Sequence, residues 1–184
     1  MATDNVSTRR LLLRPLSEAD AEGLLAAVKS SQEELKRRLR WAGAGTGLTE
    51  ERDFITASAA AMAEGDRIVL GVFEARSEEL VGVASLDRRL SSEPEQARFT
   101  IWIRSDKTGK GLATEVGRAI IEIAFKKLAC HRLFVRLDPA NRGFRRVVKK
   151  IGFKYEGCLR DGKRINGRWV DQECWGLLKT EWKK

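Results

Sequence analysis

The middle of the chain combines two hydrophobic patterns joined by a turn that contains glycine. Across Gln96–Arg104, apolar and polar residues alternate, with Phe99, Ile101 and Ile103 on one side, as in a half-buried strand. From Leu112 onward, apolar residues recur at helical spacing through LATEVGRAIIEIAFKKL. A strand, a turn and an amphipathic helix are therefore predicted in succession.

The same patterns place the other elements, with proline and glycine as interruptions. Further strands are predicted at Arg9–Arg14, Arg67–Glu74, Leu80–Asp87, Arg132–Asp138, Phe153–Leu159 and Trp169–Leu178. Helices are predicted from a Ser17 cap to about Lys29, at Ser31–Trp41, from a Thr49 cap through Ala63, from Leu112 to just before Cys130, and at Asn141–Ile151. Residues 1–8 are expected to form a flexible start.

The order of these elements indicates a mixed α/β domain. Strand–helix–strand units in the second half favour parallel pairing, and the early run of strands favours antiparallel pairing. Gly152 fits the position just after a helix, and RDGKRING fits a hairpin between the last two strands. At 184 residues, without repeats or linkers, the chain is expected to be one domain.

Composition excludes several classes of protein. The chain is 42% hydrophobic and 33% charged, with no apolar run long enough to span a bilayer. Its first residues lack a basic segment followed by an apolar one, so a secretory leader is not expected. Three cysteines and one histidine argue against a disulfide scaffold and a zinc site, so no metal is expected and the cysteines are interpreted as small buried hydrophobes. The expected location is the cytoplasm.

The net charge is +9, which favours polyanionic partners such as nucleic acid, a ribosomal surface or a phosphorylated cofactor. The alternative is a solvated basic surface, because the basic clusters fall on helical patterns.

The turn before Leu112 has the chemistry of a phosphate site. Gly109 and Gly111 allow positive φ and close approach to the backbone, and Lys110 adds a positive charge. A helix start presents unpaired N–H groups and the positive end of the helix dipole. The segment is neither a P-loop nor a Rossmann motif, since it lacks GK[ST] and a third glycine.

With these elements placed, the whole chain resembles the GNAT-fold N-acetyltransferases, and within them the RimJ/RimL type that acts on ribosomal proteins. The resemblance extends from TRRLLLRPL near the start to the terminal LLKTEW. Four motifs carry it: TGKGLA at 108–113, DPAN at 138–141, Gly152-Phe153, and the closing NGRWVDQECWGLLKTEW. The resemblance implies a single GNAT domain over 1–184. Its central mixed, twisted sheet of about seven strands would be splayed between strands four and five and flanked by helices.

The resemblance also implies acetyl-CoA as the cofactor. The pyrophosphate would be held by the backbone of 109–113, and the pantetheine arm by the edge of strand four and by Asn141. The cofactor-binding residues implied in this way are Ile101, Ile103, Thr108, Gly109, Lys110, Gly111, Leu112, Ala113 and Asn141. A backbone N–H near Ile103 would polarise the thioester carbonyl.

Several positions depart from the family pattern. Thr108 replaces a Gln or Arg, Phe144 a serine, Val148 a tyrosine and Arg98 an acidic residue, so no general acid or base stands where relatives carry one. An α-amino group, with a pKa of about 7.7–8.0, needs a base less than a lysine at about 10.4. Positioning and the oxyanion donor would then supply the rate.

Four further residues are candidates for the site. Tyr155 is a candidate proton relay, against a reading as packing beside Phe153, and Glu173 is a candidate for orienting the amine, against a surface pair. Trp41 and Trp169 are candidate walls of the acceptor groove, against a reading as core aromatics.

The sequence leaves three classes of function open. The first is an N-acetyltransferase acting on a peptide N-terminus, for example of a ribosomal protein, or on a small amine such as a polyamine, amino sugar or antibiotic. The second is a non-catalytic acyl-CoA binder that regulates a partner, and the third, resting on charge alone, is a nucleic-acid module. The first is favoured, with no membrane and no specific nucleic acid as partner, and as a monomer or homodimer.

Overall fold

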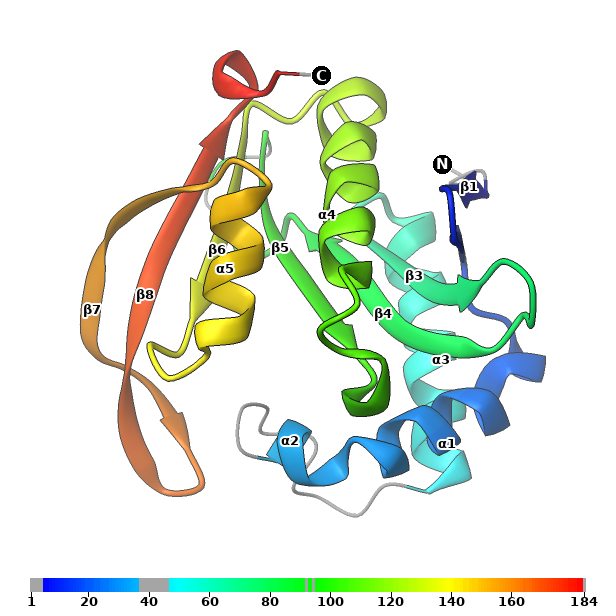
Figure 1. Ribbon diagram of the computed structural model, residues 1–184. Helices are drawn as coiled ribbons and strands as arrows, with labels where there is room; N and C mark the ends of the chain where they lie inside the picture. Colours follow the sequence, from blue (N-terminus) through cyan, green and yellow to red (C-terminus); the bar gives the residue numbers. More distant parts are fainter. Residues whose placement is uncertain (1–4, 37–46, 92, 94, 184) are drawn as a thin grey trace.

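One twisted sheet of eight strands forms the centre of the computed structural model, which describes residues 5–36, 47–91, 93 and 95–183 (Figure 1). The strands are β1 (Val6–Ser7), β2 (Leu11–Arg14), β3 (Arg67–Glu74), β4 (Leu80–Asp87), β5 (Gln96–Ile103), β6 (Arg132–Leu137), β7 (Lys154–Ile165) and β8 (Arg168–Leu178). Their order is β1-β2-β3-β4-β5-β6-β8-β7. Neighbouring strands are antiparallel except β5 and β6, which are parallel.

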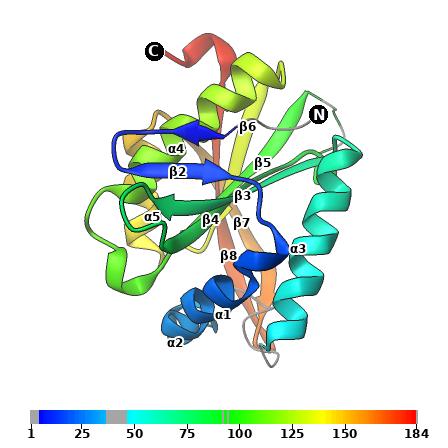
Figure 2. The ribbon, with the colours of Figure 1, turned by 90° about the vertical axis from the view of Figure 1, so that its right-hand side faces the viewer.

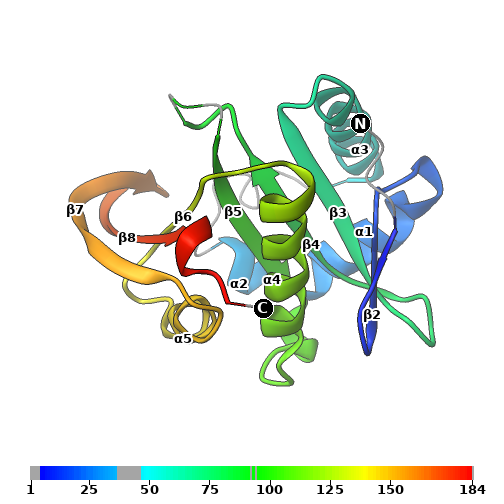
Figure 3. The ribbon, with the colours of Figure 1, turned by 90° about the horizontal axis from the view of Figure 1, so that it is seen from above.

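Helices cover both faces of the sheet (Figure 3). They are α1 (Ala21–Ser30), α2 (Gln32–Lys36), α3 (Leu48–Ala63), α4 (Leu112–Glu122) and α5 (Arg142–Lys150), and α4 continues as a π-helical turn, Ile123–Lys127. α1 and α3 lie on one face and α4 and α5 on the other (Figure 3). Among the described residues, no helix has the length and apolar character needed to cross a bilayer.

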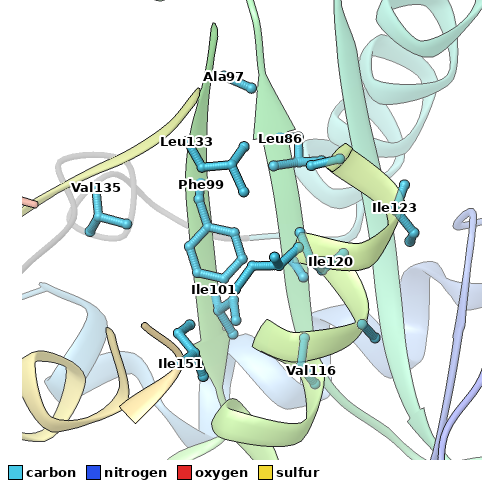
Figure 4. Packing of buried hydrophobic residues seen from close by; sticks show 14 of the residues in the cluster. Leu86, Ala97, Phe99, Ile101, Val116, Ile120, Ile123, Leu133, Val135 and Ile151 are labelled. Carbon is cyan, nitrogen blue, oxygen red and sulfur yellow. The ribbon is translucent and has the colours of Figure 1, made fainter. Parts of the chain in front are cut away.

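The larger core lies between α4 and the sheet. Val116 and Ile120 of α4 pack against Phe99 and Ile101 of β5, with Ile151 at the end of α5 beside them (Figure 4). Complete burial of such side chains contributes about 1.5–3 kcal/mol each. This packing fixes the start of α4 relative to the end of β5.

Close contact between α4 and α5 depends on a glycine. A Cβ atom at Gly117 would come within 2.8 Å of the Ile151 side chain. α5 therefore packs directly against α4.

The mixed α/β prediction is confirmed, with corrections at several boundaries. The sheet has eight strands rather than about seven, because β1 forms within the expected flexible start and pairs Val6 with Leu13. α3 begins at Leu48 with Gly47 as its cap, so the predicted cap at Thr49 is wrong. The predicted helix Ser31–Trp41 appears as α2, and its part beyond Lys36 lies outside the described residues.

The last hairpin is longer than predicted, with β7 and β8 meeting at a two-residue turn. Asn166 and Gly167 both have positive φ, 48° and 81°, as a type I′ turn requires.

The interpretation of the cysteines as buried holds for Cys130 alone, because Cys158 is exposed on β7 and Cys174 is half-buried. β7 is an edge strand, so Cys158 lies at the edge of the sheet.

Candidate active site

β5 and β6 pair over only a short stretch. Gln96–Arg98 pairs with Arg132–Phe134, and beyond it β5 continues along β4 alone, while β6 continues along β8 alone (Figure 1). The splay implied by the family resemblance is therefore present, and β5 has an unpaired edge from Phe99 to Ile103.

Hydrogen-bond alternation fixes which backbone groups face this open edge. The Arg104 N–H donates to the Val81 carbonyl at 2.8 Å, so in this antiparallel register Trp102 and the other even-numbered residues of β5 bond to β4. The N–H and C=O groups of Ile101 and Ile103 consequently point toward the gap. An extended ligand with amide groups can pair with such an edge.

The predicted turn leads directly from this edge to α4. Gly109 and Gly111 have φ of +75° and +79°, and both are exposed. Gly111 caps α4 without a side-chain hydrogen bond to the first turn, where the helix begins with Glu115 N–H bonded to the Gly111 carbonyl. The backbone N–H groups of the first turn therefore lack intrahelical acceptors and lie at the positive end of the helix dipole.

The chain just before β2, whose place in the fold Figure 2 shows, is joined to this turn by a hydrogen-bond network. The Glu115 carboxylate accepts from Thr8 Oγ1 at 2.7 Å and from Arg10 N and Nε at 2.9 and 2.7 Å. Arg10 Nη1 donates to the Lys110 carbonyl at 3.0 Å. Burial alone would raise the pKa of Glu115, but the hydrogen bonds from Thr8 and Arg10 outweigh it and hold that pKa below its usual value.

The pattern of residues along the chain did not indicate Arg10 or Glu115 as part of this site. An acidic residue in the first turn of a helix was the only local signal, and it does not reveal a partner 105 residues away. Thr108, in contrast, uses its hydroxyl locally and donates to the Ser105 carbonyl at 2.8 Å.

Asn141 lies at the start of α5, where it caps the helix. Its Oδ1 accepts from the Phe144 N–H at 3.1 Å, which leaves the side-chain NH2 as a donor. Phe144 is half-buried against the main core and Val148 is fully buried. These two positions, where the resemblance implied a serine and a tyrosine, therefore serve packing.

The two candidate catalytic side chains already have structural contacts. Glu173 accepts from Arg145 Nε and from Trp175 Nε1, each at 3.0 Å, and so ties β8 to α5. Tyr155 is exposed on the edge strand β7, where its ring packs edge-on against Trp175 at 5.4 Å between centroids. β8 separates β7 from β6, so the structure does not bring Tyr155 to the gap.

On the side of α1 and α2, the tip of the β7–β8 hairpin reaches the end of α2. Asn166 Nδ2 donates to the Lys36 carbonyl at 3.2 Å. Trp169, near this tip, is 61% exposed, while Trp41 lies outside the described residues.

In the part of the chain that the structure describes, no cluster of three or more His, Cys, Asp or Glu side chains has the geometry of a metal site.

Comparison with known proteins identifies the family. The family model described as the acetyltransferase (GNAT) domain matches residues 10–154. The chain therefore belongs to the GNAT acetyltransferases, enzymes that transfer acetyl groups.

The relatives agree with the resemblance to the RimJ/RimL group. The chain is 31% identical over 173 residues to the putative ribosomal N-acetyltransferase YdaF of Bacillus subtilis (strain 168), covering 94% of this chain and 93% of the relative. It is 29% identical over 175 residues to the probable N-acetyltransferase YjcK of the same organism, covering 94% and 96%.

A solved structure supports the fold. RimL, a ribosomal L7/L12 alpha-N-protein acetyltransferase in complex with coenzyme A, superposes with a TM-score of 0.87. The match covers 95% of this chain and 98% of RimL at 20% sequence identity, so it bears on the fold alone.

Proposed function

We propose that this protein transfers an acetyl group from acetyl-CoA to the N-terminal α-amine of a protein or peptide. One observation carries the proposal: the unpaired edge of β5 leads straight to an exposed group of backbone donors at the start of α4. One ligand with an extended amide arm and a diphosphate matches both features.

The turn suits the diphosphate of acetyl-CoA. In the proposed complex, backbone N–H groups of Gly109, Lys110, Gly111, Leu112 and Ala113 surround the phosphate oxygens, with Thr108 at the entrance. A neighbouring pocket lined by Arg9, Arg118 and Lys150 supplies further positive charge. These contacts combine donors, helix dipole and cations, as phosphate sites at helix starts do.

The open edge suits the pantetheine arm, whose two amides resemble a short peptide strand. Ile101 and Ile103 offer backbone donors and acceptors on one side, and the free NH2 of Asn141 offers a donor on the other. An unpaired N–H of this edge also serves as the donor that polarises the thioester carbonyl.

When bound, acetyl-CoA supplies an acetyl group activated as a thioester. The acceptor nitrogen forms the new bond to the acetyl carbon, the carbon–sulfur bond breaks, and the proton lost from the amine passes to solvent. The protein positions the amine and stabilises the developing oxyanion. Glu173 is bound to Arg145, and Tyr155 lies exposed on the outer strand, so neither side chain is placed to act as a base. This arrangement supports an acceptor amine that needs little help in losing its proton, such as an α-amine.

Turnover tests the proposal directly. The purified protein, acetyl-CoA and a panel of peptides, polyamines and amino sugars are incubated together, and free thiol is followed with time. Faster thiol release with peptides that have a free N-terminus, abolished when that terminus is blocked, is the expected result. Preferential turnover of polyamines or amino sugars contradicts the peptide acceptor, and cofactor binding without turnover of any amine contradicts the function.

A pair of glycine variants tests the cofactor site. Gly111→Val places a β-branched residue at φ +79° in the turn, and Gly65→Val does the same at φ +80° in the open turn between α3 and β3. Both variants carry a similar backbone strain of about 1–3 kcal/mol. Calorimetric titration should show acetyl-CoA affinity lost in Gly111→Val and kept in Gly65→Val, and equal affinity in both would place the site elsewhere.

A further inference from the structure

The sheet face opposite α4 and α5 carries several arginines beside one carboxylate. Side chains alternate between faces along a strand, and Phe99 of β5 packs under α4, so Arg98 points to the opposite face. The same alternation places Arg67 of β3, Asp87 of β4 and Arg136 of β6 on that face. This arginine group lies beside the point where β5 and β6 diverge.

Among the described residues, Asp87 is the carboxylate that lies against these arginines, and it already has two basic partners. Its Oδ1 accepts from the Arg89 backbone N–H at 3.1 Å, and its Oδ2 accepts from Arg89 Nη2 at 3.4 Å. Arg67 Nε lies 3.6 Å from the same Oδ2, and this buried nitrogen has no hydrogen-bond partner. The charge on Asp87 is therefore divided between the guanidinium groups of Arg67 and Arg89.

Arg98 is half-buried. It lies opposite Asp87 in the β4–β5 register, yet neither Arg98 nor Arg136 forms an ion pair or hydrogen bond with an acidic side chain within the described ranges. Burial lowers the pKa of Arg98, and the positive charges of Arg67 and Arg136 lower it further against the opposing effect of Asp87. Arginine remains protonated nonetheless, so among the described residues Arg67, Arg98 and Arg136 outnumber the single carboxylate that acts on Arg98, and positive charge is left over on this surface.

Arg98 lies within reach of the unpaired edge of β5, where the thioester is proposed to bind. It is the last β5 residue paired with β6, three residues before Ile101 and five before Ile103, which is roughly 10–17 Å of strand. α4 and α5 cover one face of the gap, while the hydrogen bond between Asn166 and the end of α2 borders the other. This hydrogen bond lies at the wide end of the gap, because the Ser105 N–H donates to Ser31 Oγ at 3.0 Å and the hairpin tip extends past the Leu137–Glu173 pair. A peptide whose amine lies at the open edge reaches the arginine group when it extends along this second face toward the paired end of β5.

We propose that the acceptor carries a carboxylate within about four residues of its reactive amine, and that Arg98 and Arg136 bind this carboxylate. The inference rests on the proposed function and narrows it to one class of acceptor: acidic N-terminal segments of proteins or peptides. A fork of guanidinium donors suits a carboxylate, and an anion bound here neutralises charge that is otherwise uncompensated.

The test compares peptides that differ only in one carboxylate. Tetrapeptide amides that begin with alanine and carry either aspartate or asparagine at the second, third or fourth position are assayed for kcat/KM and, with coenzyme A present, for binding by calorimetry. Free alanine and alaninamide form a second pair, which separates a side-chain carboxylate from the α-carboxylate of a free amino acid. The protein variants are Arg98→Met, Arg98→Lys and, as a control for net charge, Arg76→Met in the exposed turn after β3.

The expected result is a preference of about tenfold for the aspartate peptide, equivalent to one charge-assisted hydrogen-bonded pair. The preference should disappear in Arg98→Met, persist in part in Arg98→Lys and remain in Arg76→Met. The melting temperature of Arg98→Met should not fall, because Arg98 contributes no direct ion pair; a marked fall would assign Arg98 a structural role and overturn the proposal.

Equal use of the aspartate and asparagine tetrapeptides at all three positions, or a preference that survives Arg98→Met, also overturns the proposal. A preference confined to free alanine over alaninamide contradicts the peptide acceptor and with it this inference. If aspartate peptides bind in an Arg98-dependent manner but no amine is acetylated, the arginine group is supported and the proposed function fails. If neither binding nor turnover occurs, both fail.

Discussion

The contact between Glu115 and the start of β2 allows a quantitative test of how the turn is held. Glu115 accepts three hydrogen bonds from Thr8 and Arg10, and its side chain is only 16% exposed. The Arg10 side chain is 37% exposed, so the ion pair itself is worth about 1 kcal/mol or less. The bonds from Thr8 Oγ1 and the Arg10 backbone N–H to a charged acceptor, at about 1.5 kcal/mol each, are the larger contribution.

Glu115→Ala should therefore lower the free energy of unfolding by about 2–4 kcal/mol, which corresponds to a fall in melting temperature of roughly 5–15 °C. Glu115→Gln keeps an acceptor oxygen and should lose about half as much. Because Arg10 also donates to the Lys110 carbonyl, acetyl-CoA binding should weaken about tenfold in Glu115→Ala.

Thermal unfolding and calorimetric titration measure the two effects. Glu122→Ala on the same helix is the matched control, since its pair with Lys126 is exposed and should cost no more than about 0.5 kcal/mol. If Glu115→Ala melts within about 2 °C of Glu122→Ala, the network does not stabilise the turn and the reasoning is refuted.

Three further outcomes are expected. Glu173→Gln should destabilise the protein by about 2–3 kcal/mol in thermal unfolding, because the half-buried Arg145 loses its charged partner; an unchanged melting temperature would contradict a structural role. Tyr155→Phe should leave kcat within about twofold, since the side chain faces solvent on the edge strand, and a loss of a hundredfold would restore it as a proton relay. Burial raises the pKa of Asp20, but the hydrogen bonds from Arg14 outweigh burial, so the folded-state pKa lies below its usual value. The contribution of Asp20 to stability is therefore present above about pH 4 and is lost as pH falls through this lower folded-state pKa. Unfolding measured between about pH 6 and 2 should show a smaller acid-induced loss of stability in Asp20→Asn, and an identical loss would contradict this contribution.

Local patterns predicted the parts of the site that lie close together in sequence. The alternation up to Ile103, the paired glycines and the amphipathic segment from Leu112 are each short-range signals, and the structure joins them as strand, turn and helix. The Asn–Gly pair at 166–167 was within the predicted hairpin, but the length of β7 and β8 depends on pairing with each other and not on either sequence alone.

Long-range contacts account for what the sequence did not reveal. Arg10 meets Glu115, and Glu173 meets Arg145, only because the sheet brings distant strands to the starts of α4 and α5. The unpaired state of Arg98 is equally a property of the assembled face, since it depends on how Asp87 is divided among neighbours. β1 was missed because Val6–Ser7 is too short for periodicity to identify.

The three-residue pairing of β5 with β6 also divides the sheet into two blocks joined by a narrow hinge of main-chain hydrogen bonds. Beyond that hinge, the blocks are connected mainly by packing beneath α4 and α5. A ligand that pairs along β5 while contacting α5 would act as a cross-brace between them. Its binding at 100 times the dissociation constant would add about 2.7 kcal/mol to the unfolding free energy, and amide exchange should then slow on both sides of the hinge rather than on β5 alone.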